Sequence, residues 1–406
     1  MTRSLHPWPV PPPRVAVVDV RSLPRPGVPV LPVPRAAEPT TPERTTPEPT
    51  TPEPTTLERT SEPVIPAAAP AAGGASGSAV LVTGSGGPAG VAVVRRLVAL
   101  GHRVVAVDID PIAAGSALAA VGGVVPRADE PGFVDALLAF AAEHGADALV
   151  STVAEELPAL TAAAGRFAAA GLATWLPEVA AVDLCCDKAA FAVRLVEAGV
   201  PTPATAATVA GAADVPGPWI VKPRAGRGSR GVQLLDSAAE VTAAMTADPG
   251  LIVQTRLAGR EFTADALVAR DGELLTVVPR WRDATKAGIS VQGTTFESEA
   301  VTTVVADALE AVGLTGPANV QGFVADDGTV TVVEINPRFS GGLPLTLAAG
   351  ADVVGAYLAG VREPAAQLPY LYFSPGVRMS RYFAETYTSL DGAPVSDPCA
   401  APAVTR

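Results

Sequence analysis

Residues 316–338, with the sequence GPANVQGFVADDGTVTVVEINPR, contain two apolar stretches on either side of an Asp-Asp-Gly turn. An Asp-Gly pair between alternating apolar residues predicts a β-hairpin. Side chains two positions apart in a strand share one face, so Glu334 and Asn336 should point the same way, with Gln321 on the partner strand. Hard oxygen ligands from two neighbouring strands suit Mg²⁺, whose remaining positions take water and phosphate oxygens. Arg338 leaves the second strand where it could meet a transferring phosphoryl group.

A basic, glycine-rich segment lies upstream of this hairpin. Residues 219–232, WIVKPRAGRGSRGV, have the pattern of a strand that ends at Lys222 and runs into a Gly/Ser/Arg loop. Backbone N–H groups of such a loop can cover a triphosphate, and Lys222 adds a point charge. The alternative is an exposed basic hairpin turn. Only three of the 29 Lys and Arg residues are Lys, which favours positions that need a compact ammonium, with chance as the alternative for any single Lys.

The first part of the folded region has the pattern of a parallel α/β domain. Apolar strands are expected at 79–84, 102–108 and 148–152, with amphipathic helices at 88–99 and 133–144. The pattern changes to α+β near residue 183.

A glycine-rich turn, Gly84–Gly90, follows the first of these strands and precedes a helix. Glycines there expose N–H groups that suit an anion, and Asp108 ends the next strand, where a dinucleotide ribose would be held. This pattern alone would favour an NAD-dependent oxidoreductase, although a plain strand–turn–helix junction needs the same glycines. Further along, Glu155 and Glu156 either reach an acceptor amine or place favourable acidic charge at a helix N-terminus.

Composition excludes several classes of partner. The net charge is −12, and charges in residues 1–78 cancel, so the folded part is acidic. An acidic surface argues against nucleic acid or an anionic membrane as the partner. The three cysteines show no metal-ligand spacing, and the sequence has neither a signal-type apolar region at its start nor 18 uninterrupted apolar residues. A cytoplasmic location is therefore expected.

Several motifs occur in a fixed order from residue 187 onward. They are Asp187-Lys188, AGVPTP at 198–203, IVKPRAGRGSRGV at 220–232, QTRL at 254–257 with GREFT at 259–263, and NVQ at 319–321 with EINPRFSGG at 334–342. Together they resemble the ATP-grasp superfamily, closest to the carbamoyl-phosphate-synthase-like branch, over about residues 79–385.

The resemblance implies a mixed α/β and α+β fold in a defined order. Residues 79–183 would form a doubly wound, Rossmann-like parallel-sheet domain that does not bind NAD. Residues 184–385 would form a two-subdomain ATP-grasp domain. Residues 1–78 are expected to be a disordered low-complexity tail or linker and residues 386–406 a flexible C-terminal tail. Homodimers are frequent in the superfamily.

The resemblance also implies roles for individual residues. Nucleotide phosphates would be bound by Lys188 and Lys222 and covered by Gly228 and Ser229. Adenine would be read by Gln254, Thr255 and Leu257, and ribose by Glu261. Mg²⁺, with Mn²⁺ as the alternative, would be held by Gln321, Glu334 and Asn336. Transfer would be assisted by Arg338, Arg280 and Lys222. Gln321 and Thr255 depart from the superfamily's commonest residues, which are acidic at both positions.

The implied function is that of an ATP- and Mg²⁺-dependent ligase. It would activate a small carboxylate, such as an amino acid, as an acyl phosphate and pass it to an amine. Two alternatives stay open, namely a non-catalytic nucleotide-binding regulator and the NAD-dependent oxidoreductase described above.

The repeat EPTTP ERTTP EPTTP EPTTL ERTSE at residues 38–62 has two interpretations. Pro-spaced Thr and Glu bury no apolar area, which is typical of a solvated spacer. Thr hydroxyls beside regularly spaced Glu residues also resemble the peptides that some ATP-grasp enzymes crosslink through Thr–Glu esters.

Overall fold

The structure, a computed structural model, describes residues 79–226, 230–286, 288–390 and 394–396. The repeat-bearing segment 1–78 and the loop residues Gly228 and Ser229 lie outside the described residues.

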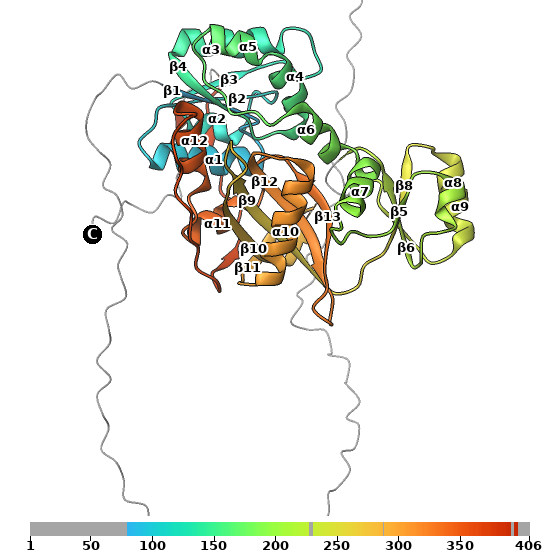
Figure 1. The fold of residues 1–406 in the computed structure, drawn as a ribbon. Helices are drawn as coiled ribbons and strands as arrows, with labels where there is room; N and C mark the ends of the chain where they lie inside the picture. Colours follow the sequence, from blue (N-terminus) through green and yellow to red (C-terminus); the bar gives the residue numbers. More distant parts are fainter. Residues whose placement is uncertain (1–78, 227–229, 287, 391–393, 397–406) are drawn as a thin grey trace, which may run out of the picture. The chain divides into compact units, whose positions relative to one another are not determined.

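The N-terminal domain is built on a parallel four-stranded sheet in the order β3-β2-β1-β4 (Figure 1). Its strands are β1 (Ala79–Thr83), β2 (Val104–Asp108), β3 (Val121–Val124) and β4 (Ala146–Val150). Its helices are α1 (Pro88–Ala99), α2 (Ala114–Leu118), α3 (Phe133–His144), α4 (Leu157–Ala162) and α5 (Ala164–Ala169), with a 3₁₀ turn at Ala154–Glu156. The strand order reverses between β1 and β4, and their carboxyl ends meet at this switch point.

The inner strands of this sheet, β1 and β2, are buried on both faces. Along β1, Val80 and Val82 pack in a core with α1, whereas Ala79 and Leu81 pack in a second core with α3. A parallel strand covered on both sides needs apolar residues at every position, which explains the unbroken run AVLV.

A smaller antiparallel sheet follows, in the order β5-β8-β6-β7 (Figure 1). Its strands are β5 (Thr205–Ala206), β6 (Trp219–Pro223), β7 (Gln233–Leu235) and β8 (Leu251–Thr255). The associated helices are α6 (Val179–Cys186), α7 (Lys188–Glu197), α8 (Val209–Ala212) and α9 (Ala238–Ala247). Val221 and Val253 pack against α9 in one core, so Lys222 and Gln254 project from the opposite face.

The largest sheet has six antiparallel strands in the order β13-β12-β9-β10-β11-β14 (Figure 1). Its strands are β9 (Arg260–Val268), β10 (Leu274–Lys286), β11 (Ile289–Thr295), β12 (Gly316–Val324), β13 (Val330–Asn336) and β14 (Arg378–Ser380). The helix α10 (Glu299–Val312) lies along one face, in a core with Phe262, Val320 and Ile335. The helices α11 (Leu343–Ala348) and α12 (Val353–Arg362) contribute to the core on the other face, and β15 (Tyr387–Thr388) pairs with β16 (Pro394–Val395).

The expected fold class is confirmed, because a parallel α/β sheet precedes two antiparallel sheets. The hairpin at 316–336 and the helices at 88–99 and 133–144 also form as predicted. Among the helices of the described residues, none has the length and apolar character that a bilayer crossing requires.

Candidate functional site

A polar strip crosses the α11 and α12 side of the largest sheet. It is formed by Glu334, Gln321, Thr263, Arg280 and Thr295, which are aligned across five neighbouring strands. The opposite faces of the same strands carry the apolar core under α10. Strand alternation therefore separates a structural face from a face that can bind a polar ligand.

A β-bulge in β13 places the expected metal ligands on this polar face. Gln321 is paired with Glu334 but Gly322 is paired with Val332, so Val333 is the extra residue of the bulge. As a result Val332 and Ile335 both pack under α10, while Glu334 lies on the opposite face. Simple alternation from Val332 would have turned Glu334 into the core.

The three candidate ligands of Mg²⁺ are brought together. Gln321 is directly opposite Glu334, and the Asn336 side chain donates a hydrogen bond from Nδ2 to Glu334 Oε1 at 3.1 Å. Among the described residues no group of three or more His, Cys, Asp or Glu side chains could hold a metal ion, and the candidate set consists instead of one carboxylate and two amides. All its donors are oxygens, which fits a hard cation that takes its other ligands from phosphates and water.

Arg338 lies just beyond this set, in the segment that leaves β13. Its Nη1 donates to Phe339 O at 2.9 Å and its Nη2 to Asn336 Oδ1 at 3.3 Å. The guanidinium therefore lies beside the candidate ligands, as the sequence predicted for a residue that contacts a transferring phosphoryl group.

Lys222 and Lys188 belong to the smaller sheet and to the start of α7. The pKa of Lys222 is lowered to about 8, mainly by burial. The charge of Glu334 opposes this fall, and the charge of Lys188 contributes to it. Lys222 therefore lies close enough to Glu334 and to Lys188 for the charge of each to act on it. Lys188 Nζ also donates to Gly226 O at 2.8 Å, at the edge of the loop that contains the undescribed Gly228 and Ser229.

Gln254 and Thr255 end β8, and residues 256–259 connect it to β9 of the largest sheet. The buried Gln254 donates from Nε2 to Thr205 Oγ1 at 2.8 Å, and Thr255 Oγ1 donates to Pro216 O at 2.8 Å. Leu257 is half-buried in the same connection. Because both polar side chains already contact protein groups, adenine recognition here would depend on the backbone.

Glu261 and Arg282 form an ion pair on the polar face. Arg282 also donates to Gly288 O at 3.0 Å. The Glu261 carboxylate is one-third exposed, so a ribose hydroxyl could reach it but would share it with Arg282.

Arg280 is buried in a network that the sequence did not reveal. Its guanidinium pairs with Asp265 and donates to Ser340 Oγ at 3.0 Å, and both ion-pair partners have almost no exposed side-chain surface. Asp265 also accepts from Asn319 Nδ2 at 3.1 Å and from Thr346 Oγ1 at 2.6 Å. Arg280 thus anchors the segment that follows Arg338, and its direct contact with a substrate stays a prediction.

In the glycine-rich turn of the N-terminal domain, a backbone N–H group is already hydrogen-bonded to the carboxylate of Asp108. The Gly86 N–H donates to Asp108 Oδ2 at 2.7 Å. A dinucleotide diphosphate would have to replace this carboxylate and lie near Glu155 and Glu156, which adds like-charge repulsion. The local geometry therefore disfavours the NAD interpretation of Gly84–Gly90.

Glu156 lies at the switch point of the parallel sheet and is 7% exposed. It accepts hydrogen bonds from Thr83 Oγ1 and, at 2.8 Å, from Ser151 Oγ. Burial raises its pKa to about 7, the two hydroxyls oppose that rise, and Asp108 and Glu155 add to it. The plain helix-N-terminus interpretation does not account for so buried a carboxyl.

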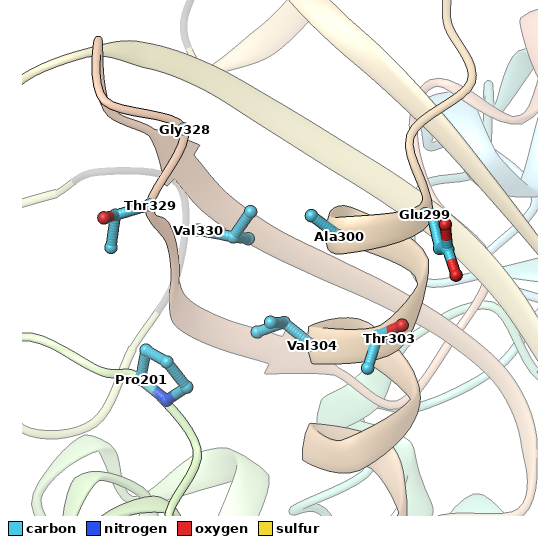
Figure 2. Close-up of a pocket in the computed structure, with 8 residues that line it drawn as sticks. All are labelled: Pro201, Glu299, Ala300, Thr303, Val304, Gly328, Thr329 and Val330. Atoms are coloured by element: carbon cyan, nitrogen blue, oxygen red, sulfur yellow. The ribbon is translucent and has the colours of Figure 1, made fainter.

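A shallow groove of about 460 Å³ lies on the α10 side of the largest sheet, away from the polar strip. Figure 2 shows Ala300 and Val304 of α10 facing Val330 across it. The other lining residues are Pro201, Glu299, Thr303, Gly328 and Thr329. The lining side chains are mostly small or apolar and include the acidic Glu299 but no Lys or Arg, so the groove lacks a cation that would favour a phosphate.

Two family descriptions match the chain. Residues 80–175 match "PylC-like, N-terminal domain", and residues 247–380 match "ATP-grasp in the biosynthetic pathway with Ter operon". The chain therefore contains an ATP-grasp domain behind a PylC-like N-terminal domain, and the ATP-grasp resemblance is confirmed.

Solved structures with the same fold include two ligase-type enzymes. A biotin carboxylase from Campylobacter jejuni, in a β-γ-ATP complex, is 17% identical with a TM-score of 0.59, covering 72% of this chain and 73% of that one. An L-amino acid ligase from Bacillus licheniformis is 17% identical with a TM-score of 0.56, covering 71% and 74%. At these identities the likeness shows the fold.

A curated relative, the uncharacterized protein y4rH of Sinorhizobium fredii, is 28% identical over 209 residues. The match covers 45% of this chain and 43% of that protein, so the chain matches less than half the length of this relative.

Proposed function

We propose that this protein is an ATP- and Mg²⁺-dependent ligase that activates a carboxylate as an acyl phosphate and transfers the acyl group to an amine. The proposal is supported chiefly by the oxygen-rich ligand set of the larger sheet together with Lys222 of the smaller sheet, which is near enough to Glu334 to be affected by its charge. Lys222 and Lys188 come from the smaller sheet and α7, and Glu334 with Gln321 and Asn336 comes from the larger sheet. Cations beside an oxygen-rich ligand set are what a metal–triphosphate complex requires.

The side chains would have different roles in the first step. Lys222 and Lys188 would hold the phosphates, and Arg338 would stabilise charge on the γ-phosphoryl group as the substrate carboxylate attacks it in line. Mg²⁺, when held by Gln321, Glu334 and Asn336, would neutralise charge on the β- and γ-phosphate oxygens. This step forms an acyl phosphate and releases ADP.

In the second step a neutral amine attacks the acyl carbon. Phosphate leaves, the nitrogen loses a proton, and an amide is formed, so the protein needs no nucleophile of its own. Closure of the 224–231 loop over the site would exclude water from the acyl phosphate. The fold shared with an L-amino acid ligase supports an amino acid as the carboxylate. A homodimer and a cytoplasmic location stay predictions.

The test is an ADP-release screen over pools of amino acids and small carboxylates, each with and without added amines. Release that needs both a carboxylate and an amine would support the ligase. Nucleotide binding without turnover in any pool would favour the regulator. An NADH fluorescence titration tests the oxidoreductase, and saturable NADH binding would contradict our interpretation of Asp108.

A further inference from the structure

A chain of hydrogen bonds connects Asp265 with the candidate metal ligand Gln321 through Asn319, and each donor in it faces toward Asp265. Asp265 Oδ1 accepts from Arg280 and from Asn319 Nδ2, and Oδ2 accepts from Thr346 Oγ1. Asp265 is 3% exposed and Asn319 is 4% exposed, so water competes little for these contacts. An ionised carboxylate can only accept hydrogen bonds, whereas an amide side chain donates at one end and accepts at the other.

Asp265 therefore sets the orientation of the Asn319 amide. With Nδ2 directed to the carboxylate, Asn319 Oδ1 must face the other way. In that position it accepts from Gln321 Nε2 at 3.4 Å. A reversed Asn319 would bring its carbonyl oxygen against the carboxylate, which is repulsive and leaves a buried donor without a partner.

The orientation of Gln321 follows in the same way. Because its Nε2 is directed to Asn319, its Oε1 is the end of the amide that points away, in a long contact of 3.5 Å with Arg282 Nη1. A cation can be bound by that oxygen but is repelled by an NH₂ group. An acidic residue at position 321 would not need such control, since both of its terminal atoms are oxygens.

We propose that Asp265 and Asn319 are positioning residues that fix the amide of Gln321 so that Oε1 is presented to the bound metal ion. The inference rests on the proposed function for the metal site and adds the device by which a Gln replaces a carboxylate there. Groups that hydrogen-bond to metal ligands typically change metal affinity about 10- to 100-fold when removed.

The key variant is Asn319→Ala, which removes the relay and leaves the Asp265–Arg280 pair in place. Asn319→Leu does the same while filling the volume. The matched control is Thr346→Val, which removes the other neutral side-chain partner of the same carboxylate but does not contact Gln321. Folding of each variant is checked by circular dichroism and thermal denaturation.

The measurement is the affinity for a non-hydrolysable ATP analogue by calorimetry, with saturating Mg²⁺ and again with EDTA. The ratio of the two affinities reports the metal contribution without any turnover. Both Asn319 variants should lower this ratio by about tenfold, with little change in EDTA. Thr346→Val should keep the wild-type ratio. Adding Gln321→Glu to Asn319→Ala should restore the ratio, since either carboxylate oxygen can bind the ion.

Three results would overturn the proposal: wild-type ratios in both folded Asn319 variants, an equal loss in Thr346→Val, or no restoration by Gln321→Glu. A wild-type protein whose affinity for the analogue is unaffected by Mg²⁺ would instead contradict the metal site itself. The proposed relay and the proposed function can therefore fail separately.

Discussion

Glu334 is the only carboxylate in the candidate ligand set, and its loss should be the most damaging single change at the metal site. We expect Glu334→Ala to abolish ADP formation, because the two remaining amide ligands carry no charge to offset that of Mg²⁺. The fold should persist, since the side chain lies outside the core under α10. Activity is measured by ADP release and folding by circular dichroism, with the exposed Glu310→Ala as the control. Normal turnover by Glu334→Ala would refute the metal assignment.

Lys222 tests whether an ammonium is required where another cation would keep the charge. A planar guanidinium does not fit a buried position made for a compact ammonium, so Lys222→Arg should be severely impaired. Arg230→Lys, at an exposed position near the end of the same loop, is the opposite exchange and should have little effect. Steady-state ADP release compares the two. A Lys222→Arg enzyme within about threefold of wild type, roughly 0.6 kcal/mol in the barrier, would show that the shape of the cation is unimportant.

Glu156 should make stability depend on pH. Its pKa is raised from 4.5 to about 7 by burial, with Asp108 and Glu155 adding to the rise and its hydroxyl partners opposing it. The protonated form is thus favoured in the folded state. Its stabilising contribution is complete below pH 4.5 and is lost as the pH rises through about 7.

Glu156→Gln keeps the shape of the protonated side chain without the titration. Relative to the variant, the wild type should lose on the order of 3 kcal/mol of unfolding free energy between pH 4.5 and 7.5. Urea unfolding at several pH values measures this difference. A constant difference across that range would mean that Glu156 does not titrate there.

The sequence identified candidate ligands whose polar side chains are unusual beside an apolar strand. It did not identify the residues that hold those side chains in place. Glu334, Asn336 and Arg338 stand out because they follow an apolar strand. Asp265 lies in the strand EFTADALV, where alternation gave a usable indication, because Thr263 and Asp265 fall on one face and Phe262 and Ala264 on the other. That Asp265 meets Arg280 and Thr346 could not be predicted, since those contacts depend on tertiary packing.

At the scale of secondary-structure elements, strand ends differ from the predicted ones where a residue makes a local hydrogen bond in place of a strand-to-strand hydrogen bond. The strand expected from residue 102 begins at Val104, because His102 N donates to Leu97 O and completes the end of α1. The strand expected to run to Thr152 ends at Val150. Thr152 Oγ1 instead donates to Thr83 O at 2.9 Å, which turns the chain toward Glu156.

The bulge in β13 is a second case in which an element departs from its pattern. Three consecutive apolar or β-branched residues precede Glu334, and alternation alone does not say which of them is the extra one. Pairing of Gly322 with Val332 identifies Val333. A bulge requires a partner strand, so the sequence of β13 by itself could not locate it.

The start of α7 gives a prediction at this scale. Asp187 caps the helix by accepting from Ala189 N at 3.0 Å, and its carboxylate also accepts from Arg224 Nε at 2.7 Å. Asp187→Ala should lower stability by about 1 kcal/mol through loss of the cap and should weaken ATP binding, because Lys188 is the first helical residue. Asp187→Asn should keep the cap and most of the stability. Thermal denaturation with analogue titration distinguishes the two, and equal stability of both variants would exclude the cap as the cause.

At the scale of the whole molecule, the candidate site is a local exception to the overall charge. The chain carries a net charge of −12, yet both lysines at the site adjoin a loop with additional Arg residues. An acidic exterior would repel free nucleotide weakly and at long range, whereas the cations of the proposed site would attract it at contact distance. Sequence composition disfavours nucleic acid as a partner class but carries no information on which lysines lie near one another in the fold.

Residues 1–78 pose the last question, because the described residues between 79 and 338, which exclude 227–229 and 287, supply nearly all of the proposed site without them. If the segment is a spacer, a protein that starts at residue 79 should keep full ADP release with a free carboxylate and amine. If its Thr and Glu side chains are substrates, the full chain should consume ATP without added substrate and the truncated one should not. Each Thr–Glu ester formed would remove one water, so intact mass should fall by about 18 Da per ester after incubation with Mg-ATP.

The matched control is the full chain with Glu334→Ala, which has the same repeat and should show no mass change. A spacer is the expected outcome, since Pro-spaced Thr and Glu require no binding partner to remain solvated. A fall in mass in the wild type but not in Glu334→Ala would reverse that expectation.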